Sequence, residues 1–240
     1  MRIKGSTLKI IAMLSMVIDH LAAVVLMPSV GLFGGLEFGE ARALGGAALF
    51  LYGMRQIGRL AFPIFCFLLV EGLVHTRSRR RYLRNLVVLA ILSEIPFNLC
   101  ISGGLIDLSH QSTIWTLTIG FIACTGLDRL DATQPEPGLA LKKAALVGAF
   151  MIFAYVLQTD YDAFGVAFIV LLYLLRDSRT EQCVIGGVVC LFGEAAAALA
   201  FIPIYFYNGE RGKQPKWLFY AFYPTHLIVL YFTRLWWLGW

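Results

Sequence analysis

An acid and an imidazole stand side by side in an otherwise apolar stretch, SMVIDHLAAVV, as Asp19 and His20. Ionisable side chains are costly in hydrocarbon, so inside a membrane span they usually face a partner or a water-filled cavity. A histidine can take a proton from an amine or hydroxyl that attacks an acyl group, provided that another group fixes its tautomer. The pair therefore predicts a polar site that suits acyl transfer and equally suits proton-coupled transport. The alternative is a polar pair that only joins two helices.

Other polar residues inside apolar stretches are expected near the same depth. At 1.5 Å per helical residue, Asp19 and His20 lie roughly 18–20 Å from the cytoplasmic end of the first stretch. Guanidinium and amide groups at that level could bind phosphate, carboxylate or a developing negative charge. We therefore expect a polar cavity that opens outward. The candidates for cofactor binding are Arg59, Glu71, Asn98, Asn208, Arg211 and His226.

Structural alternatives accompany these assignments. Arg59 and Glu94 could form only an ion pair, and His226 could be structural as well. Glu71 and Glu194 lie deeper, where they either line a path from the cytoplasm or, as we favour, are structural. The remaining histidines, His75 and His110, fall at helix ends or in loops and are read as ordinary interfacial residues. The five cysteines have no paired spacing, which argues against a zinc site or a disulfide framework.

The composition indicates a membrane protein. The chain is 59% hydrophobic and 15% charged with a mean hydropathy of +0.74, whereas soluble domains are about 45–50% apolar and about 25% charged. We predict an all-α, polytopic helical bundle that forms a single domain over 1–240, with about eight or more spans and kinks at its internal prolines. An interfacial or re-entrant segment is expected at 29–54. The predicted spans are 7–27, 55–75, 82–101, 112–127, 140–157, 162–176, 183–207 and 217–238.

The basic residues predict how the spans are oriented. Five arginines in the run HTRSRRRYLR place the loop after the second span in the cytoplasm by the positive-inside rule. Alternation of the spans then puts both termini in the cytoplasm and the YNGERG loop, with Asn208 and Arg211, outside. The arginine run either serves topology and contacts with anionic headgroups or attracts an anionic cytosolic substrate.

Several stretches together resemble the TraX family of bacterial membrane proteins. They span residues 7 to 233 and include IDH, GRLAFPIF, SEIPFN, YNGERG and FYPTH. The founding member is implicated in N-terminal acetylation of conjugative F-type pilin, so the resemblance implies an acetyl-CoA-dependent acyltransferase of the bacterial inner membrane. A more distant similarity links a span containing histidine, followed by FPIF, to the membrane acyltransferases that acetylate heparan-type glucosamine. That similarity implies that His20 is the catalytic general base, and we expect Asp19 or Glu94 to orient it.

The expected function is transfer of an acetyl group from cytosolic acetyl-CoA to an amine or hydroxyl at the outer face of the membrane. We expect no metal and no nucleic acid, and membrane lipids and the acetyl acceptor as partners. The acceptor could be a peptide amine, an amino sugar or a glycan hydroxyl. Two alternatives stay open, because the same residue types suit a small proton-coupled transporter and the chain could also be a non-enzymatic assembly factor for an envelope structure.

Overall fold

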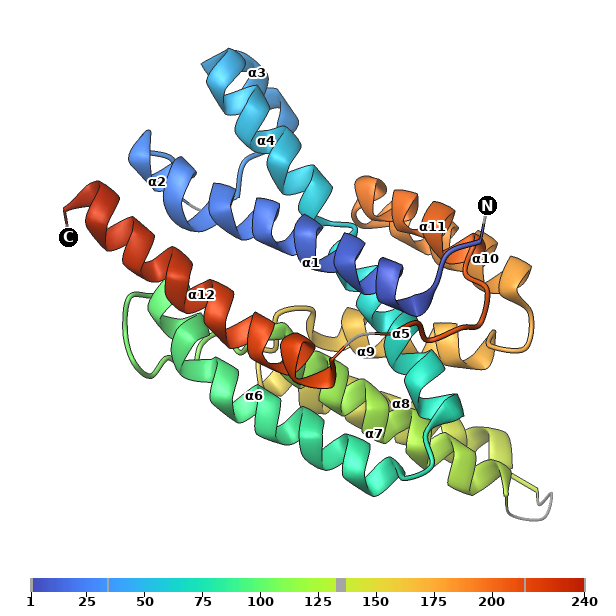
Figure 1. Ribbon diagram of the computed structural model, residues 1–240. Coiled ribbons are helices and arrows are strands. Elements are labelled where there is room, and N and C mark those ends of the chain that lie inside the picture. Colours follow the sequence, from blue (N-terminus) through green and yellow to red (C-terminus); the bar gives the residue numbers. More distant parts are fainter. Residues whose placement is uncertain (1, 34, 133–136, 214, 240) are drawn as a thin grey trace. The chain divides into compact units, whose positions relative to one another are not determined.

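A computed structural model describes residues 2–33, 35–132, 137–213 and 215–239. Within these residues the regular elements are helices. Two isolated β-bridges, Ile3–Tyr207 and Gln111–Thr159, connect residues outside the helices. The all-α prediction is therefore confirmed (Figure 1). The chain forms two compact units that alternate along the sequence: the first contains residues 1–65, 99–103 and 183–240, and the second contains 66–98 and 104–182. The expectation of a single domain stays a prediction.

The first unit is built around the N-terminal helix α1 (Gly5–Leu21), which continues through one π-helical stretch, Ala22–Leu26. Helix α4 (Gly46–Gly58) packs along α1, and Gly58 at its end makes the close approach possible. A Cβ atom at Gly58 would lie 2.2 Å from the Cβ atom of Asp19. The other helices with most of their residues in this unit are α2 (Met27–Ser29), α3 (Phe38–Leu44), α10 (Arg179–Phe192), a 3-10 helix at Ala195–Ala200, α11 (Phe201–Tyr205) and α12 (Lys216–Leu238).

The predicted span 183–207 is wrong, because this stretch is a helical hairpin. Helix α10 ends at Phe192, and Glu194 precedes the 3-10 helix in an extended conformation. Residues from α10, such as Cys183 and Gly187, line one hollow together with Phe201 and Tyr205 from the returning arm. The chain therefore reverses at Gly193 and Glu194, and Phe206 returns toward the side where α10 began.

The hairpin changes the side on which the YNGERG loop lies. Ile3 N–H donates to the carbonyl of Phe206, and Asn208 N–H donates to the carbonyl of Ile3, both at 2.9 Å. Gly5 N–H donates to the carbonyl of Glu210 at 2.8 Å. The loop thus lies beside the N-terminal residues, and the prediction that it faces the opposite side of the membrane is wrong.

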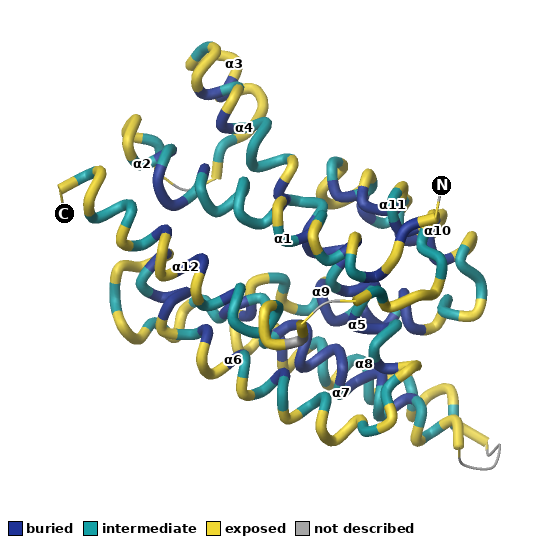
Figure 2. The backbone as a smooth tube through the Cα atoms, viewed as in Figure 1, coloured by how far each residue is buried: buried dark blue, intermediate teal, exposed yellow. Residues whose placement is uncertain are grey.

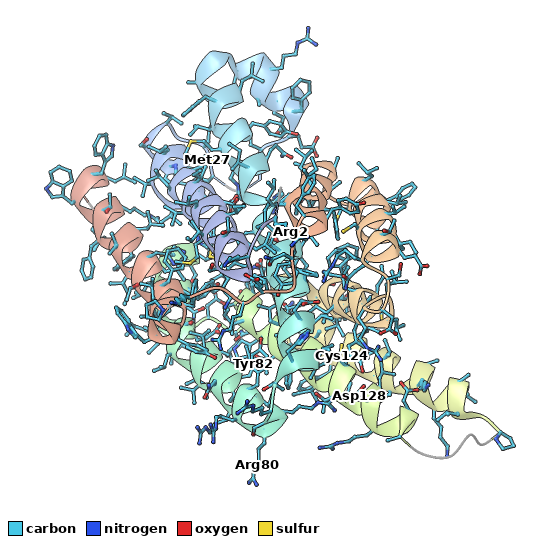
Figure 3. The ribbon with its side chains drawn as sticks, turned by 45° about the vertical axis from the view of Figure 1, so that its right-hand side comes forward. Arg2, Met27, Arg80, Tyr82, Cys124 and Asp128 are labelled. Carbon is cyan, nitrogen blue, oxygen red and sulfur yellow. The ribbon has the colours of Figure 1, made fainter. Side chains whose placement is uncertain are left out.

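Helices α1 and α12 run in the same direction. They begin at neighbouring loop segments, and α12 then packs along α1 and its π-helical stretch. Figure 1 shows the N-terminus at the start of α1 and the C-terminus near its far end, and Figure 3 labels Arg2 and Met27 at these two ends. The expectation that both termini share one face therefore has no support in the structure.

The second unit packs α7 at its centre. Ten residues of α7 (Thr113–Asp131) are buried, whereas α8 (Leu139–Val156) buries only Ala154 among its described residues. In Figure 2 most of α7 is dark blue (buried), whereas α8 is mainly teal and yellow (intermediate and exposed). Gly120 lets α9 (Asp162–Leu174) approach, because a Cβ atom there would lie 2.5 Å from Ile169 Cδ1. The remaining helices, α5 (Ala61–His75) and α6 (Arg79–Ile101), have most of their residues in this unit.

Four helical segments are long and apolar enough to cross a membrane within the described ranges. The prediction of a membrane protein is supported, but the prediction of eight or more spans is not. The proline kinks are not supported either, because α6 continues through Pro96 and α12 continues through Pro224. The four segments are Gly5–Ser29, Gly46–His75, Arg79–Ile101 and Leu139–Val156.

Candidate functional site

Two histidines from opposite ends of the chain meet in the first unit. His20 Nδ1 lies 2.8 Å from His226 Nε2, and the two rings are inclined by only 7°. The ring centroids are 5.1 Å apart, which matches two coplanar rings that meet edge to edge through this hydrogen bond. Sequence reasoning placed both histidines at one depth, and the structure brings them together.

The backbone around His226 determines the tautomers of the pair. His226 Nδ1 lies 2.9 Å from the carbonyl of Phe222, which can only accept, so this nitrogen carries the proton. In a neutral His226 the Nε2 atom is then an acceptor, and His20 Nδ1–H must donate to it. His20 therefore keeps its own Nε2 unprotonated when both rings are neutral. An unprotonated ring nitrogen on a fixed imidazole is what a general base requires.

Aromatic packing holds His226 in place. The ring of Phe222, one turn earlier in α12, stacks on His226 with centroids 4.7 Å apart, and Tyr223 meets it edge-on. His226 is 8% exposed, and the neighbouring Leu227 accepts a hydrogen bond from Cys100 Sγ at 3.0 Å. The imidazole is therefore both buried and oriented.

Asp19 faces α4 instead of the neighbouring imidazole. Its Oδ2 atom accepts a hydrogen bond from Arg55 Nη1 at 2.7 Å, in an ion pair that is largely buried. Adjacent residues on a helix point about 100° apart, so Asp19 and His20 address different neighbours. Arg55 was missed because the sequence reading placed it at the outer end of a span. Its position one turn before Gly58, on the face that packs on α1, is the signal that would have found it.

A second ion pair joins α4 to the tip of the α10–α11 hairpin. Arg59 Nη2 lies 3.3 Å from Glu194 Oε1. This arginine follows the last residue of α4, and Glu194 stands at the chain reversal. The pair therefore connects the hairpin tip to the C-terminal end of α4, the helix whose Arg55 binds Asp19 of α1.

The π-helical stretch begins two residues after His20. Ala22–Leu26 makes hydrogen bonds with the wider π spacing, and three of its five residues are buried. Short π-helical insertions inside α-helices are rare and frequently mark functional sites. The apolar sequence AAVVL gives no signal that would predict a π-helical stretch.

The second unit contains three further predicted site residues. Glu94 Oε2 accepts hydrogen bonds from Ser112 Oγ at 3.1 Å and Trp115 Nε1 at 3.0 Å. Asn98 is buried and donates to the carbonyl of Leu105 at 3.4 Å. These contacts join α6 to the loop that follows it and to the start of α7.

Glu71 is held by a cation at the other end of this unit. Arg179 Nη2 lies 3.0 Å from Glu71 Oε1, and its guanidinium covers the ring of Phe67 at 4.3 Å. Arg179 also donates to Gln182 at 3.1 Å. Glu71 therefore forms an ion pair with Arg179, and its predicted role in cofactor binding stays a prediction.

His110 has a more specific environment than its sequence position indicated. Its Nε2 atom lies 3.1 Å from Asp160 Oδ1, and Thr113 also donates to this carboxylate. The hydrogen bond to Asp160 raises the pKa of His110 above its ordinary value, against the opposing effect of burial. The sequence QTDYDAFG, with two acids between helices, is the signal that was available.

The two remaining candidates lie in the loop beside the N-terminus. Asn208 Oδ1 accepts from Glu210 N–H at 3.0 Å, which shapes the turn. Arg211 is exposed on this loop. Glu210 forms an ion pair with Lys4 at 2.9 Å, so the loop is attached to the N-terminal residues by side chains as well as by its backbone.

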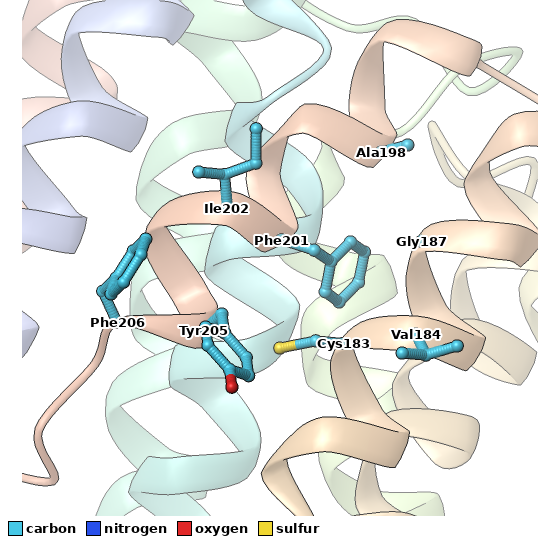
Figure 4. A pocket seen from close by; sticks show the side chains of 8 residues that line it. All are labelled: Cys183, Val184, Gly187, Ala198, Phe201, Ile202, Tyr205 and Phe206. Carbon is cyan, nitrogen blue, oxygen red and sulfur yellow. The ribbon is translucent and has the colours of Figure 1, made fainter.

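Two apolar hollows lie elsewhere in the first unit. The hollow between α10 and the returning arm has a volume of about 330 Å³ and a lining of small, aliphatic and aromatic residues (Figure 4). A second, of about 580 Å³, lies around Met27 and Leu44 with Glu40 as its charged residue. The polar cavity expected around His20 stays a prediction.

Comparison with known proteins identifies the family. The sequence model of the TraX protein matches residues 4–234. A relative from Dichelobacter nodosus, described as "Probable fimbrial assembly protein FimC, serogroup H1", is 28% identical over 244 residues that cover 93% of this chain and 92% of the relative. No solved structure matches, and neither match extends to the acyltransferases of heparan-type glucosamine. Because the match covers nearly the whole sequence, this chain belongs to the TraX family.

Proposed function

We propose that this protein is a membrane acetyltransferase that moves an acetyl group from cytosolic acetyl-CoA to an amine or hydroxyl acceptor. The observation that carries the proposal is the hydrogen bond from His20 Nδ1 to His226 Nε2. It supplies a general base whose tautomer is set by a second residue. We therefore assign the orienting role to His226, in place of Asp19 and Glu94.

In the proposed reaction His20 Nε2 removes a proton from the acceptor as its nitrogen or oxygen attacks the acetyl carbonyl. The new bond to the carbonyl carbon forms and the carbon–sulfur bond of the thioester breaks. His20 then returns the proton to the departing CoA thiolate. His226 stabilises the protonated His20 in this cycle by redistributing charge through the shared hydrogen bond. General acid–base catalysis of this kind contributes typically 10²–10⁴-fold to the rate.

The family assignment supports this chemistry in outline. TraX proteins are associated with pilin, and the relative from Dichelobacter nodosus is described as a probable fimbrial assembly protein. We propose a pilin or fimbrial subunit as the acceptor, with its N-terminal amine as the favoured group. A bacterial inner membrane, with the N-terminal face of α1 in the cytoplasm, is the proposed location.

Transfer of radiolabelled acetyl from acetyl-CoA by purified protein tests the proposal. His20→Ala should reduce the rate by about 10²–10⁴-fold while thermal unfolding in detergent shows that the variant stays folded. His75→Ala is the matched control, since His75 is exposed at the end of α5, and it should keep the wild-type rate. Near-normal turnover by folded His20→Ala protein would remove His20 from the mechanism.

A non-enzymatic assembly role is the second candidate, favoured by the description of the relative as an assembly protein. The two functions separate in cells. If the protein acts only as a scaffold, cells that carry His20→Ala should assemble normal surface fibres whose subunits have the same mass as in wild-type cells. An enzyme instead predicts subunits lighter by one acetyl group in the variant.

A further inference from the structure

The N-terminal face of the first unit gathers an unusual amount of positive charge. Residues 2–9 and 206–213 together contain five basic residues and one acid, Glu210. We call the five side chains the N-terminal basic surface. They are Arg2, Lys4, Lys9, Arg211 and Lys213.

The backbone fixes the two segments of this surface against each other. Besides the hydrogen bonds of Ile3 and Gly5, the loop is pressed onto the first turn of α1 at Gly212. A Cβ atom at Gly212 would lie 2.1 Å from Ser6 Oγ, and its φ of +74° also favours glycine. The basic side chains of the loop are therefore presented beside those of the N-terminus by a defined structure.

The positive charge of this surface is largely uncompensated. Glu210 pairs with Lys4 at 2.9 Å. Lys9 lies over the ring of Phe219 at 4.5 Å. Within the described ranges no carboxylate forms an ion pair with Lys9. Five basic side chains on two adjoining segments, with a single acid that already pairs with Lys4, create a favourable environment for an anion.

Helix direction adds to this charge. Because α1 and α12 both begin at this face, the positive ends of both helix dipoles point toward it. Neither helix has an acidic residue in its first turn. A negatively charged ligand at this face would therefore be stabilised by both helix dipoles.

We infer that the N-terminal basic surface binds the phosphate groups of CoA, with Arg211 and Lys213 as phosphate contacts. This inference rests on the proposed function. His20 lies fifteen residues along α1 from Gly5, which corresponds to about 22 Å. The phosphates and the thioester of acetyl-CoA are at opposite ends of a long flexible arm, so a cofactor bound here reaches inward toward His20. The same surface chemistry also suits the phosphates of anionic lipid headgroups, and the experiment must separate the two sources.

Binding of CoA and of dephospho-CoA, which lacks the 3′-phosphate, is measured on full-length protein in nanodiscs of neutral phosphatidylcholine. Arg211→Gln and Lys213→Gln should each raise the Kd for CoA about five- to tenfold, as expected for loss of a charge-assisted contact. The effect should shrink with dephospho-CoA if the 3′-phosphate is the partner. Arg42→Gln is the matched control, because Arg42 is an exposed arginine of α3 that lies outside both the N-terminal basic surface and the arginine run; it should leave the Kd unchanged.

The outcomes separate the inference from the proposed function. Wild-type acetyl transfer with an unchanged CoA Kd in both loop variants would overturn the inference and leave the function in place. Variants that lose binding of phosphatidylglycerol but bind CoA normally would identify a lipid surface and likewise overturn it. Wild-type protein that neither binds CoA nor transfers acetyl would defeat the proposed function first.

Discussion

Asp19 Oδ2 lies 2.7 Å from Arg55 Nη1, so the acid beside His20 neutralises an arginine of α4 and holds two helices together. Removal of one partner leaves the other charge uncompensated in a largely buried place, which typically costs about 3–5 kcal/mol. We expect Asp19→Asn and Arg55→Gln each to lower the thermal stability in detergent clearly. The double variant should lose less than the sum of the two, because the partners are coupled. Additive losses would show that they act independently.

Gly58 should tolerate no side chain, because a Cβ atom there would meet the Cβ atom of Asp19 at 2.2 Å. Overpacking of this kind costs typically about 1–3 kcal/mol, so Gly58→Ala should lower the unfolding temperature. Gly53 in the same helix provides the control, since nothing lies within 4 Å of its Cβ position. Gly53→Ala should be neutral or slightly stabilising. Equal effects of the two substitutions would rule out the steric argument.

His226 should act by positioning His20. His226→Phe keeps a flat ring but removes the acceptor for His20 Nδ1–H, and should slow acetyl transfer by about tenfold or more. His226→Gln supplies a side-chain oxygen that can accept the same hydrogen bond, so it should recover part of the rate. A purely structural role predicts the opposite order, because the aromatic ring of phenylalanine would better preserve the packing with Phe222.

The shared face of the N-terminus and the YNGERG loop can be tested by labelling. Single cysteines introduced at Arg2 and Lys213 should react alike with an impermeant thiol reagent added to intact cells, whereas one at Trp237 should react oppositely. The native cysteines give little background because all five are buried. If Arg2→Cys and Lys213→Cys were labelled oppositely, the N-terminus and the loop would lie on opposite sides of the membrane, as the alternating spans predicted from the sequence require.

The His110–Asp160 contact predicts a pH-dependent contribution to stability. Because the pKa of His110 is raised above its ordinary value of 6.5, the folded state favours the protonated ring. The contribution is fully present below about pH 6.5 and is lost as the pH rises through the raised pKa. The pair is partly exposed, so its size should not exceed about 1 kcal/mol. The difference in unfolding temperature between wild type and His110→Gln should therefore shrink between pH 6 and pH 8.5; a constant difference would contradict this account.

The sequence predicted the helices of the second unit well, because each apolar window there is bounded by polar loops. The predicted stretches 112–127, 140–157 and 162–176 correspond to α7, α8 and α9 within a few residues. The hairpin at 183–207 was not predictable in the same way. Its two arms are both apolar, and only Gly193 and Glu194 mark the reversal, so hydropathy cannot distinguish it from one long span.

That one difference explains most of the errors about orientation. Because the chain reverses at Gly193 and Glu194, the YNGERG loop lies beside the N-terminal residues, and α12 runs in the same direction as α1. The prediction that His20 and His226 lie at one depth did not depend on orientation, because a residue near the middle of a helix has a similar depth from either face. The partners of Asp19 and Arg59 could not be predicted, since they depend on which helices pack together and not on depth.

The distance along the chain between His20 and His226 has a consequence for biosynthesis. They are 206 residues apart, and ribosomes add about 5–20 residues per second, so α1 waits roughly 10–40 s for its partner helix. During that time the buried polar groups of α1 must be shielded by lipid, water or an insertion factor. Any truncation that removes α12 would therefore leave a chain with most of its helices but no completed histidine pair.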